Sequence, residues 1–149
     1  MKFSHKLSDG VHILAYVDIY KDGDLSSQTI ASSIESNPSL VRRMMSRLVK
    51  AGLLQTSPGK VDPNLARSAD TITLLDIYCA VEDDKNILHI DDKTNLQCVV
   101  GANIQDTLRS VYDDIQMKTE LAMKEVTLQE LIDDILIREK SRSVGQTKM

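Results

Sequence analysis

The sequence predicts a mainly α-helical protein with one small β-hairpin and one long helix near its carboxyl end. Apolar residues recur every three or four positions over about 4–20 and again over 101–125, which is typical of amphipathic helices. The dipeptide Asn37-Pro38 separates two short apolar stripes, so two helices meet there at a tight turn. Residues 53–68 form two short extended pieces around a Pro-Gly turn, which predicts the hairpin.

The composition limits the class of protein. A chain of 149 residues suits one domain, or a small domain with a helical arm, and 42% hydrophobic with 27% charged residues is typical of a globular protein. No window approaches the roughly 18 apolar residues of a membrane span, and the amino terminus lacks the pattern of a signal peptide. Cys79 and Cys98 are too few for a disulfide framework. We therefore expect a cytoplasmic protein.

The first helix is followed by a short helix that Ser26 or Ser27 caps and that ends before Pro38. Asn37 then caps the next helix, which is expected over 38–51. Two helices joined by a turn of three or four residues form a helix-turn-helix pattern. The hairpin that follows stands where a winged helix carries its wing, so the fold class is a winged helix-turn-helix domain extended by a long helix.

The second half of the chain is predicted to be helical apart from one loop. Thr73 and Asp76 form a variant of the capping box at the start of a short helix. Residues 83–99 show no periodicity and predict a loop. The long helix carries an apolar row whose spacing suits lengthwise packing on another helix: Ile104, Leu108, Val111 and Ile115. Thr127 and Glu130 form a capping box that begins the last helix.

The chain is acidic overall, but its charge is unevenly distributed. Residues 1–68 carry nine Lys/Arg against six Asp/Glu, a net charge of +3, whereas residues 69–149 carry nine against sixteen, a net charge of −7. No Asp or Glu occurs over 36–61. A basic half joined to an acidic half suggests that only one half meets a polyanion.

The helix over 38–51 has two different faces. Its inward stripe is predicted to be Val41, Met44, Met45, Leu48 and Val49. Its outer face carries Ser39, Arg42, Arg43, Ser46, Arg47 and Lys50. A solvated surface would also explain these cations, but the second helix of a helix-turn-helix is the one that enters the major groove, where arginine pairs with guanine and cations meet phosphates. The sequence therefore predicts DNA binding through this helix.

Two stretches, "SSQTIASSIESNPSLVRRMMSRLVKAGLL" and "ITLLDIYCAVE", resemble the Rrf2 family of bacterial winged-helix transcriptional regulators. The resemblance runs from about Leu7 to Leu136. The segment "NLQCVVGANIQ" at 95–105 is similar to the "NPxCPVGxxIQ" element of the YwnA-type branch. The resemblance implies a homodimer made through the helix at 101–125, a roughly palindromic DNA operator, and repression more often than activation.

The resemblance and the outer face of the helix together give the candidate site residues. The expected DNA contacts are Ser27, Gln28, Asn37, Ser39, Arg42, Arg43, Ser46, Arg47 and Lys50, with Lys60 in the wing. The expected dimer interface is Ile104, Leu108, Val111 and Ile115. The family's wing commonly carries a Gly-Gly pair, where this chain has "GKVDPNLAR", so wing contacts with DNA stay open. Cluster-holding members have three cysteines before the long helix, whereas this loop has Cys98 alone, which predicts no iron–sulfur cluster and no other cofactor.

The expected domain organisation follows the same scheme. Residues 1–82 form the winged helix-turn-helix domain, and residues 83–100 form a loop of the kind that senses a signal. Residues 101–137 hold the dimerisation helix and the last helix, and residues 138–149 are expected to be a disordered tail.

Other functions remain open. Cys98 is a possible redox switch, whereas Cys79, on an apolar helix, is expected in the core. His89, Asp91 and Asp92 with Cys98 match no zinc pattern, and no catalytic motif occurs, so we expect neither a metal site nor an enzyme. The alternatives to a regulator are a protein–protein module that binds a metabolic enzyme through its acidic half, or a sensor whose small-molecule effector, unidentified, sits between the long helix and the winged domain.

Overall fold

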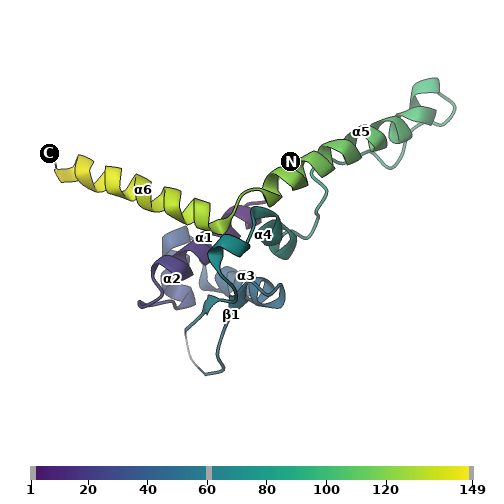
Figure 1. Cartoon of the computed structure of the whole chain (residues 1–149). Coiled ribbons are helices and arrows are strands. Elements are labelled where there is room, and N and C mark those ends of the chain that lie inside the picture. Colours follow the sequence, from purple (N-terminus) through teal and green to yellow (C-terminus); the bar gives the residue numbers. More distant parts are fainter. Residues whose placement is uncertain (1–2, 60–61, 148–149) are drawn as a thin grey trace.

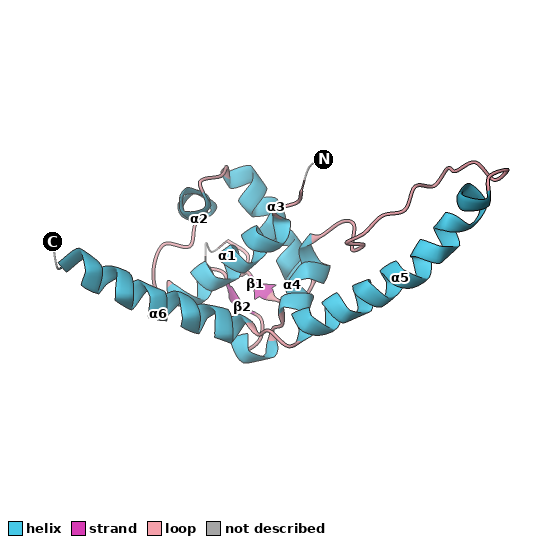
Figure 2. Cartoon of the chain, turned by 90° about the horizontal axis from the view of Figure 1, so that it is seen from above, coloured by secondary structure: helices cyan, strands magenta, loops and turns pink. Residues whose placement is uncertain are grey.

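The computed structural model describes residues 3–59 and 62–147 and confirms a mainly helical fold with one small sheet (Figure 1). The elements, in chain order, are α1 (Lys6–Ile19), α2 (Ser27–Ile34), α3 (Pro38–Lys50), β1 (Leu54–Gln55), β2 (Asn64–Leu65), the 3₁₀ helix η1 (Ala69–Thr71), α4 (Leu74–Val81), α5 (Val99–Lys124) and α6 (Leu128–Thr147). Helices α1 to α4 and the sheet form a small body, and α5 and α6 leave it on opposite sides (Figures 1 and 2).

The helix-turn-helix forms where the sequence predicts it, because both helices begin at strong caps. The Ser26 hydroxyl accepts a hydrogen bond from the amide of Thr29 at 3.3 Å, and the Asn37 side chain accepts one from the amide of Leu40 at 2.8 Å. Helix α2 ends at Glu35, whose φ of 58° is in the left-handed region. The chain therefore turns sharply between α2 and α3.

The core of the body is aliphatic, as a chain with no Trp and one Phe requires. Its fully buried large side chains include Ile13, Leu14, Leu25, Ile30, Leu48, Leu54, Ile72, Ile77, Leu128 and Ile132. Helix α1 packs closely on α4 at Gly10, where a Cβ atom would lie 3.0 Å from Ile77 Cγ2 and 3.2 Å from Val81 Cγ1. This close packing lets α1 and α4 together support the inner face of α3.

The inner face of α3 is narrower than the sequence predicts. Val41, Met44 and Leu48 are buried, and Met45 is half-buried against the core. Val49, which was predicted to face inward, has 37% of its surface exposed, so that prediction is wrong. The reason is that Val49 lies about 100° around the helix from Leu48, beyond the contact with the core.

The predicted wing is a two-stranded antiparallel sheet. Leu54 pairs with Leu65 and Gln55 with Asn64, and Gly59 has a φ of +77° in the connecting segment. Leu54 is fully buried and anchors the sheet to the body. Lys60, the predicted wing contact, lies outside the described residues.

The junction between α5 and α6 is hydrogen-bonded to the body. The amide of Leu74 donates to the carbonyl of Val126 at 2.8 Å, and the amide of Leu128 donates to the carbonyl of Ile72 at 2.8 Å. Leu128 and Ile132, in the first turns of α6, are buried in the core, whereas α5 has no buried residue. Helix α5 is therefore an arm that is held mainly at its carboxyl end.

The carboxyl-terminal segment differs from the expected disordered tail, because α6 continues through Thr147. Ion pairs one turn apart stabilise this extension: Arg138 with Asp134 at 2.6 Å and Arg142 with Glu139 at 2.7 Å. Among the helices that the structure describes, none has the length and apolar character to cross a bilayer.

Candidate nucleic-acid interface

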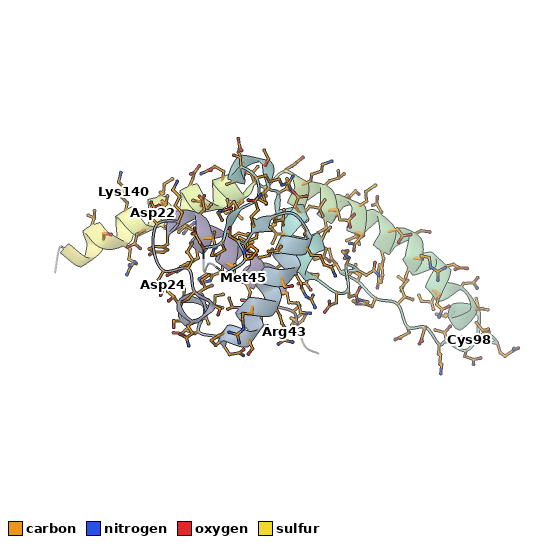
Figure 3. The ribbon with its side chains drawn as sticks, turned by 90° about the horizontal axis from the view of Figure 1, so that it is seen from below. Asp22, Asp24, Arg43, Met45, Cys98 and Lys140 are labelled. Carbon is orange, nitrogen blue, oxygen red and sulfur yellow. The ribbon has the colours of Figure 1, made fainter. Side chains whose placement is uncertain are left out.

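The outer face of α3 presents the predicted basic surface. Arg42, Arg43 and Lys50 are exposed, and Figure 3 shows Arg43 on α3 at the edge of the molecule. Among the described residues, neither Arg43 nor Lys50 has a hydrogen-bond or ion-pair partner. Two cations that no described residue engages are available to phosphates and base edges.

Arg42 joins the two helices of the motif. Its guanidinium group donates to the hydroxyl of Ser27 on α2 and to the hydroxyl of Ser39 on α3, each at 3.2 Å. Both acceptors are neutral, so the full positive charge of Arg42 remains. The structure thus brings together three of the predicted DNA contacts at the amino-terminal end of α3, the end that reads bases in a helix-turn-helix.

Three other polar residues predicted to contact DNA differ in how accessible their side chains are. Gln28 and Ser46 are exposed, so their side chains are accessible. The Asn37 side chain caps α3, so its carbonyl oxygen is already engaged by the amide of Leu40.

Arg47 differs from the other cations of α3. Its Nη1 atom donates to the carbonyl of Val81 at 2.9 Å and to Oδ1 of Asp83 at 2.7 Å. Asp83 also pairs with Lys6 of α1 through its other oxygen. Arg47 is therefore engaged with the segment that follows α4, which the sequence did not reveal because the partner lies 36 residues away.

The loop between α4 and α5 runs back along α5 (Figure 2). The side chain of Gln116 on α5 accepts a hydrogen bond from the amide of Ile87 at 3.0 Å and donates one to the carbonyl of Lys85 at 2.7 Å. The Tyr78 hydroxyl of α4 donates to the same carbonyl at 2.7 Å. Sequence reasoning missed Gln116, because a glutamine on an amphipathic helix carries no signal of such a role.

Cys98 stands at the amino-terminal cap of α5, exposed, at the tip of the arm and far from Arg43 (Figure 3). Its side chain forms no capping hydrogen bond, but the nearby backbone amides of Gly101 and Val100 lower the pKa of the thiol. The loop approaches α5 closely here, since a Cβ atom on Gly101 would lie 2.1 Å from the carbonyl oxygen of Asn95. A bulkier residue than glycine would therefore displace the loop.

Cys79 was predicted to lie in the core, and this prediction is wrong. Cys79 is exposed, whereas its neighbours Ile77, Tyr78 and Val81 are buried. The apolar composition of α4 does not reveal which side faces the body, because that choice depends on the packing of α4 against α1 and α3.

The donor atoms of the loop do not assemble into a metal site. His89 pairs with Asp84, and in the described part of the chain no group of three or more His, Cys, Asp or Glu residues is placed to hold a metal ion. An iron–sulfur cluster needs a set of thiolates or close substitutes, and this loop offers one thiol. The residues present do not fit such a cluster.

An open groove of about 570 Å³ lies between α1, α2 and α6. Its lining is largely apolar and includes Val11, Tyr16, Ile19, Ile135 and Leu136. His12 and Ser33, hydrogen-bonded to each other at 2.7 Å, lie at its edge. The groove is on the α6 side of the body, not between the long helix and the winged domain, which is the place expected for a small-molecule effector.

The comparison with known proteins finds relatives that are also named as helix-turn-helix proteins. Residues 3–134 match the Rrf2 family, which is described as an iron-dependent transcriptional regulator family. The chain is 35% identical over 121 residues to YwnA of Bacillus subtilis, a protein named as an HTH-type transcriptional regulator, and the match covers 80% of this chain and 90% of YwnA.

Solved structures of similar fold include regulators. A crystal structure described as that of a DNA-binding protein is 31% identical, with a TM-score of 0.70, and covers 85% of this chain and 98% of its own. CymR, the global cysteine regulator of B. subtilis, shares the fold at 20% identity with a TM-score of 0.64, over 89% of this chain and 97% of its own. The family and the curated relative are described as transcriptional regulators and not as enzymes. The chain belongs to the Rrf2 family of helix-turn-helix transcriptional regulators.

Proposed function

We propose that this protein is a cytoplasmic homodimeric repressor that binds a roughly palindromic DNA operator through α3 and works without an iron–sulfur cluster. The observation that carries the proposal is the outer face of α3, where Arg43 and Lys50 have no partner among the described residues and Arg42 bonds only to neutral hydroxyls there. Like charges repel one another, so these cations gain free energy by meeting an anion, and a DNA duplex provides phosphates and guanine edges.

The apolar row of α5 supports the homodimer. Ile104 and Leu108 are half-buried, and Val111 and Ile115 are 50% and 39% exposed. A helix arm with this much exposed apolar surface is stabilised by packing on a second helix, and two identical arms meet through a twofold axis. A twofold dimer then reads two half-sites in opposite orientations.

The proposed repression rests on steric exclusion by the bound dimer. A dimer of two such chains covers one operator and blocks other proteins from the same stretch of duplex. The single thiol of the loop at 82–98 supports a mechanism that needs no cluster.

A second function, thiol-redox sensing through Cys98, is favoured by one specific observation. Cys98 is exposed at the start of α5, where backbone amides lower the pKa of its thiol. In the proposed step the thiolate sulfur attacks one oxygen of hydrogen peroxide, the S–O bond forms, the O–O bond breaks, and the departing hydroxide takes up a proton to become water. The product is a sulfenic acid at the amino-terminal end of the dimerisation helix.

The experiment that tests operator binding begins with duplexes that the wild-type protein selects from a random-sequence library. Fluorescence anisotropy at several salt concentrations then compares wild type with the double variant Arg42→Ala/Arg43→Ala. We expect weaker binding and a salt slope lowered by about 2, one for each phosphate-facing cation lost.

The matched control is Arg109→Ala/Arg138→Ala, which removes two exposed arginines that pair with aspartates of their own helices. This control is expected to bind like wild type. Equal affinity and equal salt slope for wild type and Arg42→Ala/Arg43→Ala would overturn the proposal.

A further inference from the structure

In the part of the chain that the structure describes, hydrogen bonds attach α5 to the body at two places. One is the junction at residues 126–128, where backbone hydrogen bonds tie the end of α5 and the start of α6 to residues 72–74. The other is Gln116, which lies eight residues before the end of α5 and therefore about 12 Å along the helix from it. One attachment would act as a pivot, whereas two separated attachments fix the angle of the arm.

Apolar packing alone does not lock this angle, because no side chain of α5 is fully buried. The side chain of Gln116 restricts the angle instead, through two directional hydrogen bonds. Its amide group binds both the carbonyl of Lys85 and the amide of Ile87, so a rotation of α5 breaks both bonds. The carbonyl of Lys85 accepts a second hydrogen bond from Tyr78, a residue of α4 that is only 7% exposed. Gln116 is thus connected to a rigid part of the body.

The same loop segment is tied to the recognition helix α3 at its other end. Arg47 of α3 binds the carbonyl of Val81 and the carboxylate of Asp83, two residues before Lys85. Lys6 of α1 binds the same carboxylate. Residues 81–87 therefore connect α3 and α1 at one end with α4 and α5 at the other through hydrogen bonds and ion pairs.

We infer that Gln116 is a positioning residue that fixes the angle between the α5 arm and the recognition helix, and thereby the spacing of the two DNA half-sites that the dimer accepts. This inference rests on the proposed function, since spacing has meaning only for a dimer joined through α5. When two recognition helices are held rigidly, both half-sites are engaged at one separation and poorly at others. A dimer with a loosened arm would accept several half-site separations. Its affinity at each would be lower than the affinity of the rigid dimer at its preferred separation.

The test uses the duplex that the wild-type full-length protein selects from a random-sequence library. A panel is made from it with one or two base pairs removed from or added between the half-sites, together with a duplex that carries a single half-site. We expect Gln116→Ala to lose about two- to tenfold in affinity at the preferred spacing, the factor that one or two net hydrogen bonds are worth. We expect its discrimination between spacings to shrink and its affinity for the single half-site to stay unchanged.

Gln116→Glu is the second variant, because it keeps the size of the side chain and the acceptor for the Ile87 amide but loses the donor to Lys85. It should change the spacing profile in the same direction. The matched control is Gln105→Ala, which removes the same amide group from the same helix. Gln105 donates to the carbonyl of Asp91 at 2.7 Å, in a part of the loop that is not tied to α3. This control should keep the wild-type spacing profile.

A wild-type spacing profile for Gln116→Ala would overturn the inference. So would an equal loss on every duplex, including the single half-site, or the same change of profile in Gln105→Ala. If the wild-type protein selects no duplex with two half-sites, the proposed function fails and the inference fails with it, an outcome distinct from a failure of Gln116 alone.

Discussion

Arg47 and Asp83 form an ion pair that joins the recognition helix to the segment after α4, with Nη1 and Oδ1 2.7 Å apart. The Lys6 and Arg47 side chains hold the pKa of Asp83 below its usual value. A carboxyl group with a lowered pKa loses its partners only as the pH falls through that lowered value, so the pair stays intact throughout the neutral range. Arg47 therefore has a structural partner under the conditions in which DNA binding is measured.

This pairing predicts a difference between two arginines of α3. Arg43→Ala should lower the salt slope of DNA binding by about 1, because a free cation that meets a phosphate is lost. Arg47→Ala should change that slope less, since Arg47 already binds Asp83 and the carbonyl of Val81. Anisotropy titrations from low to moderate salt measure both slopes. An equal drop for the two variants would show that Arg47 leaves Asp83 to contact DNA, as the sequence predicted.

The apolar row of α5 predicts the effect of a buried charge on assembly. Val111→Glu and Ile115→Glu should each shift the protein from twice the chain mass of 16.6 kDa toward the chain mass itself, because the interface would hold an unpaired carboxylate. Sedimentation velocity measures this shift. Ser110→Glu places the same charge on another side of the exposed helix and should leave the dimer intact. A wild-type protein that sediments as a monomer would contradict the prediction outright.

The environment of Cys98 predicts how the reactivity of its thiol changes with pH. Since the backbone amides of Gly101 and Val100 lower the pKa of the thiol, the thiolate should persist to lower pH in the folded protein than in the unfolded one. In a Cys79→Ser background, the rate of alkylation by iodoacetamide should therefore reach half its maximum at a lower pH in buffer than in concentrated urea. Identical midpoints in the two solvents would remove the physical basis for a redox role. If that role holds, peroxide should release DNA from the wild type and spare Cys98→Ser.

The close contact of α1 with α4 at Gly10 predicts that one added methyl group lowers the stability of the fold. Gly10→Ala should destabilise the fold by about 1–3 kcal/mol, because the new Cβ would lie 3.0 Å from Ile77 and 3.2 Å from Val81 in a closely packed core. Urea unfolding at fixed protein concentration measures the free energy. Gly145→Ala, where a Cβ atom would meet nothing within 4 Å, is the control and should not lower stability. Equal stability of Gly10→Ala and wild type would mean that α1 and α4 separate easily.

Sequence reasoning predicted most of the fold and part of the candidate site. The caps at Ser26, Asn37 and Thr73 form as expected, because a cap depends on a hydrogen bond between residues three apart. The basic outer face of α3 follows equally from local periodicity. The inward position of Val49 and the burial of Cys79 were wrong, since both depend on how far a neighbouring element covers a helix.

The amino-acid sequence by itself determined where the helices begin, which face of α3 is basic, and that the chain belongs to a family of DNA-binding regulators. Those properties arise from interactions within a few residues of each other and from residue types in a fixed spacing. Only the tertiary structure decided that Arg47 meets Asp83, that Gln116 holds the loop at Lys85 and Ile87, and that Cys98 stands at the tip of an arm. Contacts between residues about 30 or more positions apart in the chain depend on how packed helices are oriented, and no local pattern encodes that orientation.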